Sequence, residues 1–299
     1  MDYTLANRKT LPSSSHLVGL LLVSSATIAW STAGLFTRAI ELDNWTLLFW
    51  RGVFGAAAIA LVIGIVNRNN TLSDNLRKFM SMGLSGWLFV FVSGIGMVMF
   101  ITALNHTTVA HVSILYATVP LVTAFIAWLV LSEKPTAYSL AAGFFSLIGV
   151  CIMMGFSSDG HWSGDLLALG MTICLAVMMI ITRANPDVPI LPAACLSALL
   201  SAAMALPFSN PFSVEPEQWI MLILFGVVNS ALGLVLFIIG SKYLPAIETA
   251  LITALDAPLA PIWVWILFSE APGFITMLGG SIVFIAVAVY LVTAQRQHT

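Results

Sequence analysis

Charged residues are scarce in this sequence. Only 8% of its 299 residues are Asp, Glu, Lys or Arg, whereas an ordinary soluble domain carries roughly 25%. A soluble protein of this length needs more charge to cover its surface. Because 60% of the residues are hydrophobic and the mean hydropathy is +1.01, lipid must cover the chain instead.

Cysteines are few, and the motifs of common enzyme classes are missing. Cys151, Cys174 and Cys195 lie in apolar stretches and form no CxxC pair, which is typical of packing residues rather than disulfides or metal ligands. The sequence has no HExxH, GxSxG or P-loop motif and no basic run that would indicate nucleic-acid binding. We therefore expect no cofactor, no metal site, no nucleic-acid partner and no nucleotide-driven activity.

Long apolar runs are what the sequence does have. A helix needs roughly 20 apolar residues to cross ~30 Å of hydrocarbon, and only helices satisfy the backbone of such segments in lipid. The sequence predicts an all-α integral membrane protein with ten transmembrane helices. Their approximate ranges are 16–36, 44–66, 79–104, 107–131, 136–155, 164–184, 189–207, 219–240, 245–268 and 272–294.

The basic residues predict the orientation of these helices. With the N-terminus in the cytoplasm, Arg38 falls on the outside and Arg51 falls within the second helix. All other Lys and Arg residues then lie on the cytoplasmic side, which is a strong positive-inside bias. We expect a multi-pass protein of the cell inner (plasma) membrane with the N-terminus and C-terminus both cytoplasmic.

The two halves of the chain resemble each other. Thr37-Arg38-Ala39 matches Thr182-Arg183-Ala184 at an offset of 145, and Ser132-Glu133 matches Ser269-Glu270 at an offset of 137. Each half holds five predicted helices, and five is an odd number, so the second copy enters the membrane from the opposite face. The sequence therefore predicts two inverted five-helix repeats, an architecture that transporters use around a central site.

An ordered set of motifs resembles a known family. The first half has Ala117-Thr-Val-Pro120 and Leu131-Ser-Glu133-Lys; the second has Leu255-Asp256-Ala-Pro258 and Phe268-Ser-Glu270. This pattern resembles the ten-helix EamA branch of the drug/metabolite transporter (DMT) superfamily. The resemblance implies a tail at 1–15, EamA-like repeats at 16–155 and 156–294, and a tail at 295–299. It also implies a cavity walled by helices 1, 3, 4, 6, 8 and 9.

Two charged residues lie deep in the predicted membrane. A charge at a helix centre costs ~2.5–3.5 kcal/mol on insertion scales, so each is a functional candidate. Asp256 lies near the midplane of the ninth helix, beside Pro258 and Pro261, which remove backbone donors there. Arg51, in the second helix, could bind a substrate carboxylate. The alternatives are structural: Asp256 in an internal ion pair, and Arg51 paired with Asp256 or extended toward water.

His111 and Glu248 occupy matching positions of the two repeats, at an offset of 137. His111 could relay protons, and the symmetry suggests that His111 and Glu248 form a pair of gate residues. The alternatives are a packing histidine and a helix N-terminal acid stabilised by the helix dipole. Trp30, Tyr116 and Asn229 fall near the midplane and could line a cavity, although each could equally be a packing residue.

These features together favour a secondary transporter that exports or exchanges a small metabolite, such as an amino acid or related amphipathic solute. Alternating access around a midplane cavity is the expected mechanism, with protons as a candidate coupling ion and lipid as the surrounding partner. A monomer could work because both halves lie in one chain, and a homodimer is the alternative. The competing interpretations are a membrane-embedded enzyme acting on lipid and a non-transporting sensor subunit, but the clustered polar residues or output domain that these need are not evident.

Overall fold

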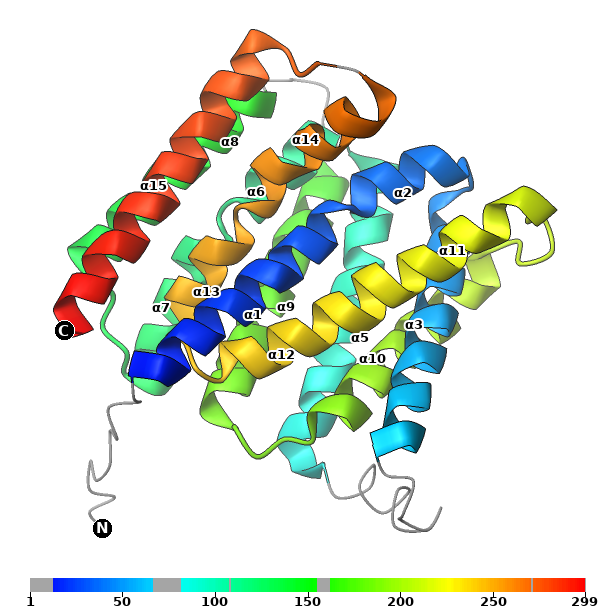
Figure 1. Ribbon diagram of the computed structural model, residues 1–299, viewed down its shortest axis with the longest axis horizontal. Helices are drawn as coiled ribbons and strands as arrows, with labels where there is room; N and C mark the ends of the chain where they lie inside the picture. The colour runs from blue at the N-terminus through cyan, green and yellow to red at the C-terminus, as the bar shows by residue number, and fades with distance from the viewer. Residues whose placement is uncertain (1–12, 67–81, 108, 155–161, 270, 299) are drawn as a thin grey trace.

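The computed structural model describes residues 13–66, 82–107, 109–154, 162–269 and 271–298. These residues form a bundle of helices that run between two ends (Figure 1). The start of α1 and the finish of α15 lie at the same end of the bundle, which we call the termini end; the α2–α3 and α14–α15 connections lie at the opposite, far end (Figure 1). The helices are α1 (Ser13–Ser31), α2 (Ala33–Ile40), α3 (Asn44–Val66), α5 (Gly83–His106), α6 (Val109–Tyr116), α7 (Val119–Leu131), α8 (Ala137–Met154), α9 (Trp162–Ala184), α10 (Ile190–Ala205), α11 (Trp219–Phe225), α12 (Leu234–Ser241), α13 (Ala246–Thr253), α14 (Asp256–Phe268) and α15 (Phe274–His298), with a π-helix, η3 (Gly226–Gly233), and short 3-10 turns η1 (Leu206–Phe208) and η2 (Pro216–Gln218).

Within the described residues, nine helices are long and apolar enough to cross a membrane. The helix Ala137–Met153 is apolar but shorter. At 1.5 Å per residue it still approaches the thickness of the hydrocarbon, and it fills the place of the fifth predicted crossing. The prediction of an all-α membrane protein with about ten spanning segments is confirmed, and we number the crossings spans 1 to 10.

Spans 4 and 9 are each broken in two at equivalent positions. The helices α7 and α14 begin at Val119 and Asp256, which are 137 residues apart, and both have 13 residues. Each ends at a serine with a left-handed backbone, Ser132 with φ 55° and Ser269 with φ 57°. The sequence predicts continuous helices here, so the breaks are a correction. Prolines just after each break lack the N–H that would continue the helix.

Spans 1 and 8 are irregular as well. Span 1 is interrupted at Thr32, between α1 and α2. Span 8 changes from α-helix to π-helix over Gly226–Gly233 and back again. Breaks and π segments inside membrane spans occur where protein, rather than lipid, surrounds the backbone. Both irregularities therefore lie where a site can be built.

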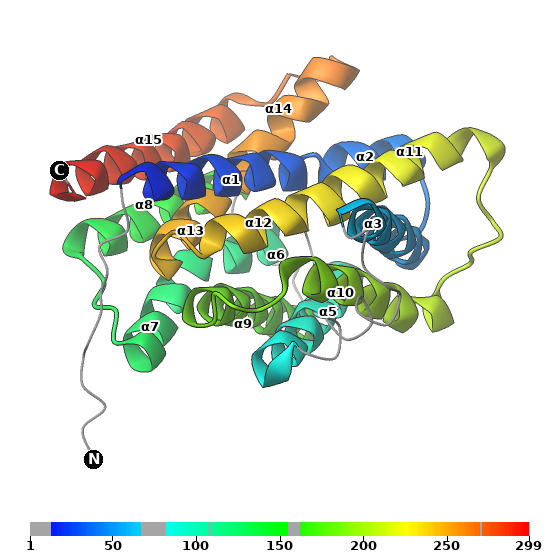
Figure 2. The ribbon, with the colours of Figure 1, turned by 60° about the horizontal axis from the view of Figure 1, so that its bottom comes forward.

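The packing of the spans follows an inverted repeat. Span 5 packs on span 10, span 2 on span 7 and span 4 on span 9, and each pair is its own counterpart when the halves are exchanged. Span 3 packs on span 6, and its counterpart, span 8 on span 1, is also present. Figure 2 shows α8 and α15 side by side at one edge of the bundle. Exchange symmetry thus holds for the most extensive contacts between spans.

Close backbone contact holds α8 against α15. A Cβ added at Gly149 would lie 2.7 Å from the carbonyl oxygen of Gly279 and 2.7 Å from a methyl carbon of Val283. A backbone atom at this distance cannot move aside cheaply. Glycine is therefore required where these two spans cross, as in other membrane helix pairs with small residues at the crossing.

We expect Gly149→Ala to lower the midpoint of thermal unfolding in detergent by several degrees. Overpacking of this kind costs roughly 1–3 kcal/mol. The matched control is Gly64→Ala, because nothing lies within 4 Å of a Cβ at Gly64. Unfolding can be followed by tryptophan fluorescence. Equal stability of the two variants would contradict the close crossing of α8 and α15.

Candidate functional site

A cavity of about 710 Å³ lies between the two halves. It begins near the breaks of spans 4 and 9 and extends to the far end, where Ala271 and Pro272 of the α14–α15 connection line it. Spans 1, 3, 4, 6, 8 and 9 line it, as the family resemblance implies. Spans 2 and 7 also contribute, through Arg51, Ser197, Ala198 and Ser201, and spans 5 and 10 contribute Met153 and Thr276.

The walls combine an apolar surface with a small polar group. Four methionines line the cavity: Met97, Met153, Met171 and Met178. Methionine is flexible and polarizable, so such walls adapt to solutes of different shape. Five of the predicted site residues also line the cavity: Trp30, Arg51, Tyr116, Asn229 and Asp256. The structure therefore brings together residues from spans 1, 2, 4, 8 and 9.

Asn229 lies at the junction of spans 1, 2 and 8. Its amide nitrogen donates to the carbonyl oxygens of Ala29 and Trp30 at 3.3 and 3.2 Å. Its amide oxygen accepts a hydrogen bond from a terminal nitrogen of Arg51 at 3.1 Å. Its backbone carbonyl accepts one from the indole of Trp30 at 3.1 Å. The Asn229 side chain is almost fully buried and its polar atoms are occupied.

The guanidinium of Arg51 reaches the cavity from span 2. It is held by Asn229, and its central carbon lies 5.7 Å from the centre of the Phe225 ring. Its Nε atom is buried and has no hydrogen-bond partner among the described residues. An Arg–aromatic contact stabilises the cation, but a buried donor without a partner costs free energy. Arg51 therefore retains a donor that an anionic ligand can use.

Asp256 begins α14, directly after the break in span 9. One of its carboxylate oxygens is buried and has no hydrogen-bond partner among the described residues. Among the described residues, no ion pair joins Asp256 to Arg51. The structural alternative, in which these two residues form a permanent ion pair, is therefore not seen in this conformation. A buried carboxylate that lacks a partner is costly. The cavity thus presents one acid and one base, each with an unoccupied hydrogen-bonding atom.

The frame of the cavity is duplicated but its polar groups are not. Offsets of 145 and 137 relate the lining residues Trp30 and Leu175, Ser93 and Ser230, and Met97 and Leu234. By the same offset of 137, Val119 stands opposite Asp256 and Val92 stands opposite Asn229. The polar side chains of Asp256 and Asn229 are therefore not part of the duplicated frame.

Toward the termini end, the cavity is closed by an apolar layer. Met179, Phe237, Ile238 and Ala250, from spans 6, 8 and 9, are buried there within one hydrophobic cluster that also includes residues of spans 1, 2, 3, 4 and 7. Trp30 packs on Phe237 with ring centroids 5.0 Å apart. The layer separates the cavity from the loops of the termini end.

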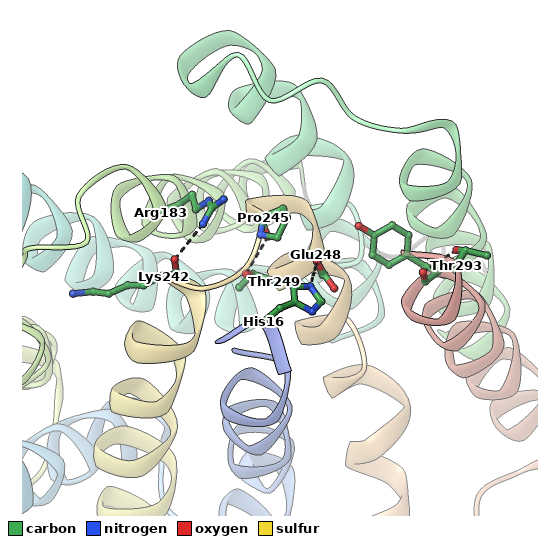
Figure 3. Close-up of polar contacts among 8 residues, drawn as sticks. His16, Arg183, Lys242, Pro245, Glu248, Thr249 and Thr293 are labelled. Atoms are coloured by element: carbon green, nitrogen blue, oxygen red, sulfur yellow. Dashed lines mark hydrogen bonds and ion pairs between the residues drawn. The ribbon is translucent and has the colours of Figure 1, made fainter. Parts of the chain in front are cut away.

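Beyond the apolar layer, a polar layer lies at the termini end, and Figure 3 shows two of its contacts, Arg183 with Lys242 and His16 with Glu248. Arg183, near the end of span 6, contacts Glu133 at 3.3 Å and donates to the carbonyl oxygen of Lys242 at 3.1 Å. The Ser241 hydroxyl donates to Thr182 at 2.9 Å. Because Glu133 belongs to the first half and Arg183 to the second, their contact joins the two halves at the termini end. The other two contacts lie within the second half. The sequence identifies Glu133 and Arg183 only as parts of motifs that recur in the two halves and does not predict their contact.

His111 and Glu248 do not line the cavity. His111 contacts the carboxylate of Asp165 at 3.0 Å toward the far end, and Glu248 contacts His16 at 3.1 Å at the termini end (Figure 3). Glu248 is 1% exposed, whereas Asp165 is 32% exposed. The two equivalent positions thus carry His–carboxylate pairs with the residue types reversed, one at each end, and each pair joins the first half to the second.

The fold and the cavity define a multi-pass membrane protein of transporter type. The model of the EamA-like transporter family matches residues 17–155 and 162–292. The chain therefore belongs to this family, within the DMT superfamily, and carries two copies of its domain. This is a family of transporters and not of enzymes.

Solved structures support the fold. Twenty-nine chains of solved structures match. One of them, titled "Crystal structure of protein", superposes on this chain with a TM-score of 0.80 at 19% sequence identity. The match covers 94% of this chain and 99% of that chain. At this identity the likeness shows the fold alone. No curated protein matches the sequence.

Cysteine labelling can test whether the cavity is reached from one side. Cys174 lines the cavity, whereas Cys195 is buried against Ala56. We expect a membrane-impermeant methanethiosulfonate reagent to modify a variant with Cys174 as its sole cysteine, and only from the far side. The matched control keeps only Cys195 and should stay unmodified. Equal modification from both sides would contradict closure of the termini end.

Proposed function

We propose that this chain is a secondary transporter that moves a small amphipathic metabolite, such as an amino acid, by export or exchange. Family membership supports the transporter class. The observation that carries the finer proposal is that Arg51 and Asp256 line the same cavity without contacting each other, and each has a buried hydrogen-bonding atom without a partner among the described residues. A carboxylate can bind the guanidinium, and an ammonium group can neutralise the acid.

Alternating access is the proposed mechanism. The solute enters the cavity from the far end while the apolar and polar layers close the termini end. Transport then requires these contacts to break and the far end to close. An inverted repeat suits this exchange, because the two halves can adopt each other's conformation. Either a proton gradient or the gradient of the solute drives the cycle.

The proposed orientation places the termini end in the cytoplasm. Arg183, Lys242 and Lys134 lie at this end or in its connections, in agreement with a positive-inside distribution. The membrane proposed is the inner (plasma) membrane of a bacterial-type cell. The cavity would then open to the outside in the conformation described.

Flux into proteoliposomes tests the proposed function. Radiolabelled L-leucine, L-methionine and L-phenylalanine serve as probes, with and without an imposed pH gradient. We expect Asp256→Asn and Arg51→Gln each to reduce flux by about tenfold or more, since each removes a charge-assisted contact. Thr102→Ala is the control, because that hydroxyl bonds only within its own helix.

The outcomes are distinct. Flux accelerated by the gradient and lost in Asp256→Asn would support proton coupling through this acid. Flux insensitive to the gradient would indicate a facilitator or exchanger. Undiminished flux in a folded Asp256→Asn protein would refute the assignment of Asp256, and no flux of any probe would refute the proposed solute class.

The polar layer at the termini end yields a separate prediction. Glu133→Gln removes the charge that Arg183 contacts, which should favour opening of this end. Both side chains are 26% exposed, so the pair contributes at most ~1 kcal/mol. We expect labelling of Cys174 from the far side to slow by up to about fivefold. Lys134→Gln, at an exposed neighbouring position, is the control; an equal effect there would contradict the proposed latch.

A further inference from the structure

The environment of Asn229 indicates a role different from that of Arg51 and Asp256. Both protons of its amide nitrogen go to carbonyl oxygens of span 1, and its amide oxygen is taken by Arg51. The side chain has no proton left for a solute. Its position near the cavity therefore does not make it a binding residue.

We propose that Asn229 is a positioning residue that fixes the Arg51 guanidinium and the break in span 1 with one amide. This inference rests on the proposed function of Arg51. It goes beyond that proposal because it assigns a task to a side chain that does not contact the solute. It also connects the Arg51 guanidinium to the break in span 1, which we call the hinge.

The first part of the task concerns Arg51. An arginine side chain carries about 2 kcal/mol of rotamer entropy, which is lost when a ligand immobilises it. Here the side chain is already held before a solute arrives, by Asn229 on one side and the Phe225 ring on the other. Such preorganisation increases affinity because less ordering is required on binding.

The second part concerns span 1. The helix α1 ends at Ser31 and α2 begins at Ala33, so carbonyl groups just before Thr32 lose their regular partners. Asn229 donates to two of these carbonyl oxygens, those of Ala29 and Trp30. The hydroxyl of Thr32 also donates to the carbonyl oxygen of Ala29, at 2.6 Å. Ala33, the first residue of α2, lines the cavity. A change at the break therefore alters the cavity wall.

The local sequence explains how an amide reaches both groups. Asn229 lies in the middle of the π-helix, where the widened turn displaces side chains from their α-helical directions. Glycines bound this segment. A Cβ at Gly226 would lie 3.0 Å from the Arg51 carbonyl oxygen, and one at Gly233 would lie 2.6 Å from the Trp30 indole nitrogen. Small residues thus bring span 8 close enough to spans 1 and 2 for one side chain to bridge them.

A double-mutant cycle in proteoliposomes tests the link to Arg51. The probes are L-methionine and its amide, L-methioninamide, which lacks the carboxylate. We expect Asn229→Ala to raise KM for L-methionine about tenfold more than KM for the amide, because only L-methionine has the carboxylate that Arg51 binds. Effects through the break in span 1 act on both probes and cancel in this ratio of KM values. Because Asn229 acts on the carboxylate through Arg51, adding Asn229→Ala to Arg51→Gln should leave the ratio unchanged. Thr102→Ala is again the control.

A further change in the ratio of the two KM values in the double variant would overturn the proposal, since it would mean that Asn229 contacts the carboxylate of the solute itself. An equal loss for L-methionine and its amide would also overturn it, because that would be the signature of a purely structural role.

Hydrogen exchange provides a readout that needs no solute. Amide exchange in the segment 29–37, measured by mass spectrometry on the full chain in detergent, should be faster in Asn229→Ala and unchanged in Arg51→Gln. Unchanged exchange in Asn229→Ala would refute the link to the hinge. If the wild-type chain moves neither probe, the proposed solute class fails, while the exchange measurement still decides whether Asn229 holds the break.

Discussion

The backbone of a membrane span must satisfy its own hydrogen bonds, and the rest of this structure depends on that constraint. Spans 1, 4, 8 and 9 all depart from regular α-helix, which lipid would not tolerate. Side chains supply the missing partners: Asn229 bonds to carbonyl groups before the break in span 1, and Thr172 donates to the carbonyl of Leu115 near the break in span 4 at 3.1 Å. The irregular spans are therefore gathered around the cavity.

The same constraint explains why the repeat is symmetric in its frame and asymmetric in its chemistry. Breaks at Val119 and Asp256 recur because both halves bend at the same place. The acid occurs only in the second copy. A duplicated frame gives the two halves similar energies, and single polar side chains then give the shared cavity one orientation for a solute with two unlike ends.

Hydropathy was sufficient to predict the spans, because the cost of an unsatisfied backbone in lipid leaves little alternative to helices. The predicted ranges 44–66 and 164–184 fall within a few residues of α3 and α9. The offset of 137 predicted the equivalence of spans 4 and 9. The five residues brought together at the cavity were found by depth alone, because a polar group near the midplane is exceptional in so apolar a chain.

Other features were beyond the sequence. Proline indicates where a helix loses a donor, but it did not predict that a two-residue turn would follow Tyr116. The π-helix has no clear signal, since glycines such as Gly226 also serve ordinary helix packing. The contact of Arg183 with Glu133 depends on how two distant helix ends meet, and each residue alone is equally consistent with a solvated helix terminus.

A transporter that alternates between two conformations needs their energies to be close, because a large bias would leave one conformation almost unpopulated. The His–carboxylate pairs bear on this balance. His111 and Glu248 occupy equivalent positions, and their partners Asp165 and His16 lie near the starts of spans 6 and 1. Each end thus has a contact of the same chemical kind between the two halves. Both His–carboxylate pairs are formed in the conformation described, so they do not by themselves favour closure of one end over the other. In the proposed cycle that bias comes from the Glu133–Arg183 contact, which is weak enough for the solute gradient to decide the direction.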